Sequence, residues 1–127
     1  GVDRPILLNI DATKVLWHPD NPGQLLYASE FELHLYDAEN HTDVLITRLS
    51  TPIKNVHWHS GGTSVMYDDG EKLFAIETDP RDVHNVFELE HFEEIETFWT
   101  NSSGRKGYVL GTQGEETGIF ERELQKR

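Results

Sequence analysis

The chain has 127 residues, no cysteine, and a formal net charge of −12 from 11 basic and 23 acidic side chains. A single domain is expected at this length. The acidic balance argues against binding to a nucleic-acid backbone, which requires Lys and Arg to displace counterions. The lack of cysteine excludes disulfides, CxxC redox sites and cysteine-ligated zinc. The longest apolar run, at Pro5–Leu8, is too short for a membrane span or a signal-peptide core.

The first predicted element is a strand at Arg4–Ile10, and a unit of four strands follows it. These four strands are expected at Thr13–Leu16, Leu25–Tyr27, Phe31–Asp37 and Asp43–Arg48. A cluster of Pro, Asn and Gly at His18–Gly23 marks the first turn of the unit. Apolar residues at successive positions of the third strand predict that it is covered on both faces.

The same order of elements returns in two further units. The second unit has predicted strands at Ile53–His57, Val65–Tyr67, Glu71–Glu77 and Val83–Leu89, and the third at Ile95–Phe98, Gly107–Val109 and Thr117–Glu121. Trp17, Trp58 and Trp99 recur at a constant spacing of 41 residues, each followed by a turn cluster. A fixed period of this length is the signature of a repeat architecture.

Repeats of four strands over about 40 residues are typical of β-propeller blades, with the first strand innermost and the fourth at the rim. No segment holds a helical apolar period, so an all-β chain with three blades is predicted. We expect an outer strand at 1–10, blade 1 at 11–50, blade 2 at 51–92, and blade 3, without its outer strand, at 93–127.

The segment Val15–Glu39 carries the most complete motif of the three units. Its pattern positions are Trp17, Pro19, Asp20, Leu26, Tyr27, Ser29, Leu33 and Asp37. In these residues the segment resembles the repeat of Tol-like and dipeptidyl-peptidase-like propellers, which are related to WD repeats. It departs from that repeat at His18, where serine is usual, and in an Asn-Pro insertion before Gly23. The resemblance implies a propeller scaffold and carries over no catalytic residue.

Three blades cannot close a ring, because propellers close with four or more. We therefore expect two copies to form a six-bladed ring, in which Arg4–Ile10 of one copy pairs beside Thr117–Glu121 of the other. The expected latch residues are Ile6, Leu7, Leu8, Ile10, Ile119 and Phe120. A nine-bladed trimer is the second alternative. A piece of a longer propeller is the third, and it is compatible with self-association.

Three histidines are candidates for a metal or anion site at the channel. His57 and His59 would project from one face of a strand, as metal-binding pairs often do, and His18 holds the place of His59 in the first unit. Such residues more often hydrogen-bond the following turn, and no obvious carboxylate completes a site. No metal or other cofactor is therefore expected.

Six aromatic residues are expected to pack between blades, because they recur at similar places in each unit. They are Trp17, Trp58, Trp99, Tyr27, Tyr67 and Tyr108. The sequence Asp68-Asp69-Gly70 predicts a tight hairpin turn. Its carboxylates are expected to be solvated charges and not calcium ligands or an acid–base pair.

Two functions fit these features. The first is a non-enzymatic interaction scaffold that binds itself, and another protein or peptide, without nucleic acid or membrane insertion. The second is an accessory propeller of a larger hydrolase or envelope protein that gates or presents substrate. No serine lies in a G-x-S-x-G elbow, so catalysis within the chain is not expected. The residues leave the compartment open between the cytoplasm and the bacterial cell envelope, which the resemblance suggests.

Overall fold

The computed structural model describes residues 12–59, 63–78 and 86–124, and the regular elements in these ranges are all β-strands. They are β1 (Lys14–Trp17), β2 (Gln24–Ala28), β3 (Glu32–Asp37), β4 (Thr42–Arg48), β5 (Asn55–Trp58), β6 (Ser64–Asp68), β7 (Lys72–Glu77), β8 (Val86–His91), β9 (Glu94–Thr100), β10 (Lys106–Gln113) and β11 (Glu116–Glu123). No helix in these ranges is long and apolar enough to cross a membrane. The all-β prediction is confirmed here, while the strand predicted at Arg4–Ile10 lies outside the described residues.

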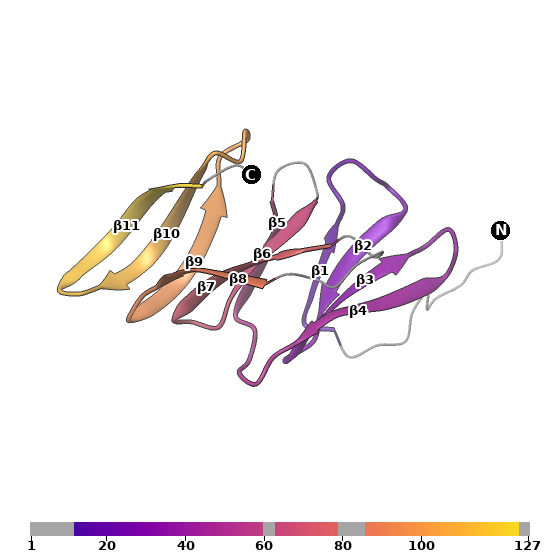
Figure 1. Cartoon of the computed structure of the whole chain (residues 1–127), viewed down its shortest axis with the longest axis horizontal. Helices are drawn as coiled ribbons and strands as arrows, with labels where there is room; N and C mark the ends of the chain where they lie inside the picture. Colours follow the sequence, from indigo (N-terminus) through magenta and orange to yellow (C-terminus); the bar gives the residue numbers. More distant parts are fainter. Residues whose placement is uncertain (1–11, 60–62, 79–85, 125–127) are drawn as a thin grey trace.

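Three antiparallel sheets hold these strands, and each sheet corresponds to one unit of the sequence repeat. The first sheet has the order β1-β2-β3-β4, the second β5-β6-β7-β8 and the third β9-β10-β11. Figure 1 shows the first and third sheets at opposite ends of the long axis, with the second between them. The innermost strands are in series, since β1 contacts β5 and β5 contacts β9.

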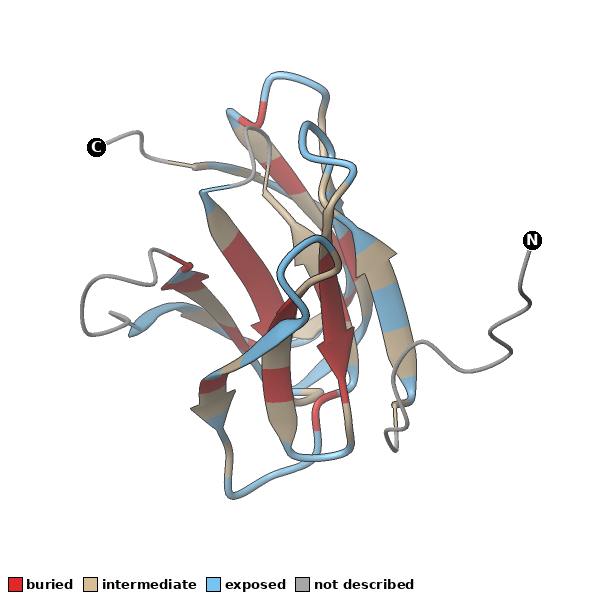
Figure 2. Ribbon diagram, turned by 90° about the vertical axis from the view of Figure 1, so that its right-hand side faces the viewer, coloured by how far each residue is buried: buried red, intermediate tan, exposed pale blue. Residues whose placement is uncertain are grey.

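Alternate residues of the first and second sheets form the core between them. Leu26 and Leu35 enter this core from the first sheet, and Val56, Tyr67 and Ile76 enter it from the second. Successive side chains on a strand point to opposite faces, so the residues between these positions face away from the core. Figure 2 shows the buried residues concentrated on the central strands.

A second core lies between the second and third sheets. Met66 and Leu73 meet Ile95, Phe98 and Val109 there. Met66 neighbours Tyr67 on β6, and the two side chains enter different cores. The central strands of the second sheet, β6 and β7, are therefore covered on both faces, which explains their apolar residues at successive positions.

The turn between β6 and β7 has the geometry expected for a tight hairpin. Gly70 has a φ of 99°, a region that a side chain disfavours. The Asp69 carboxylate accepts hydrogen bonds from the N–H groups of Glu71 and Lys72. The expectation that both aspartates are solvated is wrong for Asp68, which is fully buried. Its side chain points inward from the end of β6, whereas that of Asp69 belongs to the turn.

The third sheet contains a close backbone approach at a β-bulge between Leu110 and Gly111. A Cβ atom placed on Gly111 would lie 2.3 Å from the carbonyl oxygen of Glu94 on the neighbouring strand. Real Cβ atoms do not approach backbone oxygen this closely, so the strands would have to separate.

We predict that Gly111→Ala lowers the free energy of unfolding by about 1–3 kcal/mol, the usual cost of forcing extra volume into a packed site. Gly107→Ala is the matched control, because its added Cβ would only touch the end of the Leu124 side chain, at 3.4 Å. This control should change stability by less than about 0.5 kcal/mol. Urea denaturation of both variants measures the difference, and equal losses would contradict the close approach.

Candidate functional site

Trp58 lies at the contact between the first and second sheets. Its indole N–H donates a hydrogen bond of 3.3 Å to the carbonyl oxygen of Leu16 on β1. The indole also packs against the first core and contacts the edge of the His18 ring at 4.6 Å between centroids. Trp58 therefore joins its own blade to the preceding one through both packing and a hydrogen bond.

Trp17 and Trp99 lie on the two outermost faces of the stack. Leu16 packs into the first core, so its neighbour Trp17 points away from the second sheet, and it is 55% exposed. In the third sheet Phe98 enters the second core, and its neighbour Trp99 faces outward with 39% exposure. In the part of the chain that the structure describes, Trp58 alone of the three tryptophans lies between two blades, and the other two are exposed.

The three candidate tyrosines occupy two different positions of the repeat. Tyr27 pairs with Val15, and Tyr67 pairs with Val56 in the same register. Tyr108 instead pairs with Trp99, on which its ring stacks at 5.8 Å. Phe98 pairs with Val109 in the register in which Val56 pairs with Tyr67, so an equal spacing in sequence does not give Trp99 and Tyr108 equivalent positions.

His18 stabilises the turn that follows its strand. Its Nδ1 atom accepts hydrogen bonds of 3.0 Å from the N–H groups of Asp20 and Asn21. This is the hydrogen bonding to the following turn that is usual for such a residue. Its ring also contacts Trp58, so the imidazole helps to hold the first two sheets together.

His57 and His59 both reach toward the third sheet. The His57 ring packs edge-on against Phe98 at 5.0 Å, and burial lowers its pKa. The Nε2 atom of His59 lies 2.8 Å from the carbonyl oxygen of Gly104. Within the described ranges, no three His, Cys, Asp or Glu side chains converge as a metal site requires. The observed contacts of these histidines are thus between sheets.

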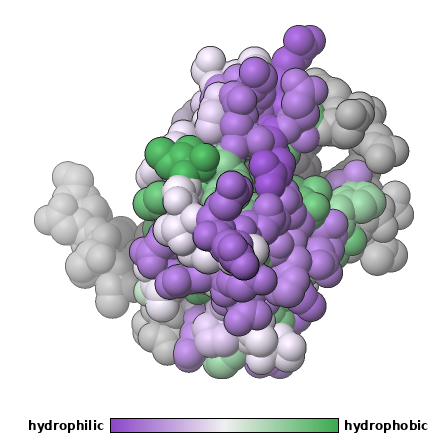
Figure 3. Space-filling model, turned by 90° about the vertical axis from the view of Figure 1, so that its left-hand side faces the viewer, coloured by the Kyte–Doolittle hydropathy of each residue, from purple (hydrophilic) through white to green (hydrophobic). Residues whose placement is uncertain are grey.

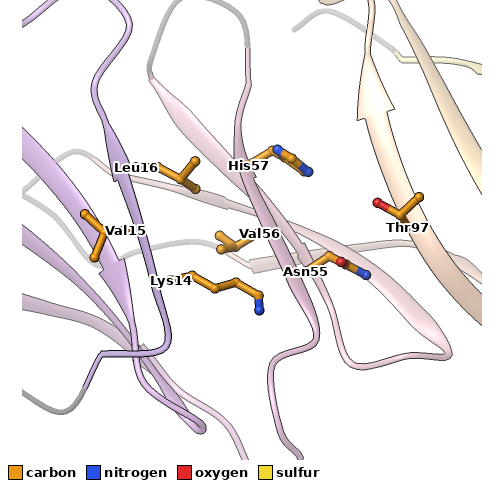
Figure 4. Close-up of a pocket in the computed structure, with 7 residues that line it drawn as sticks. All are labelled: Lys14, Val15, Leu16, Asn55, Val56, His57 and Thr97. Atoms are coloured by element: carbon orange, nitrogen blue, oxygen red, sulfur yellow. The ribbon is translucent and has the colours of Figure 1, made fainter.

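A hollow of about 420 Å³ opens between the innermost strands of the three sheets (Figure 4). Its lining residues are Lys14, Val15, Leu16, Asn55, Val56, His57 and Thr97. The Asn55 amide is already engaged, because it donates to the Asp68 carboxylate and to the carbonyl oxygen of Glu96. The lining contains no carboxylate and no serine, and its titratable side chains are those of Lys14 and His57.

A connected polar group on the outer part of the first sheet has no counterpart in the sequence predictions. The Tyr27 hydroxyl donates to Asp43 at 2.8 Å, and the two ring nitrogens of His34 lie 3.1 Å from Asp43 and 2.8 Å from Glu32. Arg48 pairs with Glu32 at 3.0 Å. Burial and the Asp43 carboxylate raise the pKa of Tyr27, and the hydrogen bond from His34 lowers the pKa of Glu32. This group fixes side chains across β2, β3 and β4.

Large apolar side chains are exposed on the outer faces of both end sheets. On the first sheet they are Val15, Trp17 and Leu45, and on the third sheet Trp99, Leu110 and Ile119. Figure 3 views the molecule from the end where the third sheet lies and shows apolar groups set in a mainly hydrophilic surface. Interfaces between proteins commonly have such a mixed composition. These two faces are the candidate interaction surfaces of the chain.

Two of the expected latch positions, Ile119 and Phe120, lie in β11. Ile119 on β11 is exposed, whereas Phe120 packs against the second core and contacts Phe92 at 5.4 Å. Ile6, Leu7, Leu8 and Ile10 lie outside the described residues. The outer edge of β11 pairs with no other strand of the described chain.

No protein-family model matches the sequence, and no curated protein matches it either. Solved structures do share the fold. The chain is similar to one in the crystal structure of a mitotic checkpoint complex, with a TM-score of 0.61, 11% identity, and coverage of 87% of this chain and 36% of that one.

Two further matches involve the nucleoporin Nup159. The crystal structure of its N-terminal domain matches with a TM-score of 0.59 and 18% identity, over 90% of this chain and 31% of that one. The second is the S. cerevisiae complex of a Dbp5 variant with Nup159, Gle1, IP6 and ADP. It matches with a TM-score of 0.61 and 16% identity, over 90% of this chain and 31% of the other.

The matched structures are propellers of the WD40 type, so the fold of this chain is propeller-like. This likeness concerns the fold alone, because the sequence identity is low. The chain spans about a third of the length of the chains that it matches.

Proposed function

We propose that this chain is a non-enzymatic propeller segment that serves as a protein-interaction scaffold, and that a second copy closes it into a six-bladed ring. The observation that carries the proposal is the exposure of tryptophan on both outermost sheet faces. A propeller normally covers such faces by packing each blade between two neighbours. The open faces of one chain can be covered in the same way by the open faces of another.

The internal repeat supports a specific arrangement of these faces. Val15 and Trp17 hold the positions that Val56 and Trp58 hold in the second sheet, since the pairing registers of the two sheets agree in this region. Trp58 faces the preceding blade. We infer that Trp17 faces a preceding blade as well, and that the third sheet of a second copy supplies it.

Protein partners would bind the rigid loops and rims of the closed ring, because sheets fix loops in space without constraining their residues. The charge of −12 favours basic or neutral partners over nucleic acid. The neighbouring structures are complexes that contain partner proteins, which is consistent with binding of this kind.

The proposal predicts a mass in solution of twice the 14.6 kDa chain. Light scattering coupled to size exclusion measures that mass directly, over a series of protein concentrations. Three times the chain mass would support the nine-bladed trimer instead. A single-chain mass at all concentrations would contradict closure by self-association.

One observation favours a second candidate function. The chain matches about a third of each solved propeller, so the remaining blades could belong to the same longer polypeptide. The segment would then be part of an accessory propeller in a larger hydrolase or envelope protein. A single-chain mass, together with a sequence of further blades adjoining this segment, would favour that function.

A further inference from the structure

The fourth strands of the first two sheets can be compared directly, because their pairing is equivalent. Both sheets have a bulge at the same place, between Leu33 and His34 in the first and between Leu73 and Phe74 in the second. On the far side of this bulge Leu35 pairs with Val44. Val44, and Ile46 two residues later, pack into the core that the first sheet shares with the second.

The equivalent residues of the second sheet are exposed. Ala75 holds the place of Leu35 and pairs with Phe87, so Phe87 corresponds to Val44 and Leu89 to Ile46. Ala75 packs toward the third sheet, and Phe87 opposite it lies on the same face. Phe87 is nevertheless 51% exposed, and Leu89 is exposed as well.

The fourth strands differ in exposure because the sheets that follow them in the stack differ. The second sheet has a fourth strand, β8, beyond β7, whereas the third sheet ends at β11 within the described chain. Phe87 and Leu89 therefore face a place beside β11 where a fourth strand would lie. An unpaired strand edge next to exposed apolar side chains is a site for strand addition.

We propose that the edge of β11 together with Phe87 and Leu89 forms an acceptor groove, and that it takes residues 4–10 of a second copy as its fourth strand. This inference rests on the proposed ring closure and names the contacts that complete it. In the described chain β4 leads into β5, and β8 leads into β9. Residues 4–10 precede β1 in the same way, so they would supply the fourth strand of the sheet before it in the ring.

The chemistry of this segment suits the groove. Residues 4–10 contain four aliphatic residues, one charge at Arg4, and no acidic side chain. The acceptor strand β11 carries three glutamates and a single arginine. A second copy is a better donor than the same chain, because β1 and β11 belong to sheets at opposite ends of the stack (Figure 1).

Two substitutions on β8 test the groove in the full chain. Phe87→Asp should weaken dimerisation at least tenfold, because its carboxylate would be buried under the added strand. Val86→Asp is the matched control. Val86 is 47% exposed and pairs with Ile76 of the first core, so it faces away from the groove. Its effect should stay below threefold, as measured by sedimentation equilibrium.

A crosslinking experiment identifies the strand that enters the groove. Asn9 is replaced by photoreactive benzoylphenylalanine, and ¹⁵N-labelled and unlabelled chains are mixed so that crosslinks between copies can be recognised by mass spectrometry. The expected crosslinks join position 9 of one copy to residues 116–123 of another.

The outcomes separate this inference from the proposed function. A dimer in which Phe87→Asp and Val86→Asp act alike, or in which crosslinks avoid β11, would overturn the groove while leaving ring closure intact. A monomer without crosslinks between copies would overturn both. Weaker dimerisation with Phe87→Asp but not with Val86→Asp, together with crosslinks to β11, would support both the acceptor groove and ring closure.

Discussion

Trp58→Ala is expected to lower the free energy of unfolding by about 3 kcal/mol, at the low end of the cost of truncating a large core aromatic. The low end applies because Trp58 is only partly buried, although it packs on the core between the first two sheets. The substitution also leaves the Leu16 carbonyl oxygen without the indole N–H. Trp58→Phe retains most of the packing and should lose only about 1 kcal/mol.

Trp17→Ala is the matched substitution that turns this experiment into a test of the assembly. In a lone chain Trp17 is more than half exposed, so its truncation should cost less than about 0.5 kcal/mol. In a closed ring it would have the same surroundings as Trp58, and the loss should approach that of Trp58→Ala. Urea denaturation at high and low protein concentration distinguishes the two cases, because association stabilises the folded state by a free energy that grows with the logarithm of protein concentration. A negligible loss in an assembled protein would contradict the proposed packing of Trp17.

The repeat was predictable from the sequence because its determinants are local. The tryptophan spacing, the Gly and Pro turns and the short β-prone runs each act within one hairpin. Every described strand accordingly corresponds to a predicted one, with differences of a few residues at its ends. The apolar residues at successive positions of the third strand also predicted cover on both faces, and Leu33, Leu35 and Tyr36 are all buried.

The face of the third sheet on which each side chain lies was not predictable in the same way. Trp99 keeps the spacing of Trp58, but it is Phe98 that faces the preceding blade. In an antiparallel pair a shift of one residue exchanges the two faces of a strand. The pairing shows this shift, because Thr100 pairs with Gly107 as Trp58 pairs with Val65. The shift leaves the spacing of the tryptophans in the sequence unchanged.

The candidate surfaces depended on contacts between sheets, which hydrophobic patterning alone does not specify. Val44 and Phe87 look alike in sequence, as apolar residues of a fourth strand. One is packed in a core and the other exposed only because the next sheet differs. The alignment that identifies Phe87 depends on the bulge shared by the two sheets, which the strand pairing shows and the sequence does not.

Asp68 gives the chain a distinctive pH dependence. Burial raises its pKa from the usual 3.8 to about 6, despite hydrogen bonds from Asn55 and from the N–H of Gly70 and the charge of Lys54. Between these two pH values the folded chain holds a proton that the unfolded chain has released. This group therefore makes the protein more stable as the pH falls from about 7 toward 4, by up to about 3 kcal/mol.

Asp68→Asn should remove this contribution while retaining an acceptor for the Gly70 N–H. As the pH rises from 4 to 7, the stability of the variant relative to the unsubstituted chain should increase by up to about 3 kcal/mol, because only the unsubstituted chain must ionise a buried carboxyl. Urea denaturation at four pH values and one protein concentration measures the difference. A constant difference across this range would show that the buried carboxyl does not titrate there.

Asp69→Asn is the control with the opposite sign. Burial alone would raise the pKa of Asp69, but hydrogen bonds from the N–H groups of Lys72 and Glu71 and from the Thr51 hydroxyl outweigh it and lower that pKa. Asp69 therefore stabilises the fold above its unfolded pKa and loses this effect as the carboxyl is protonated. At very low pH, Asp69→Asn and the unsubstituted chain should have similar stability. As the pH rises toward 4 the variant should become the less stable of the two, and this difference should persist at pH 7. Adjacent aspartates would then show opposite pH dependences, because one side chain enters the space between two blades and the other closes a turn.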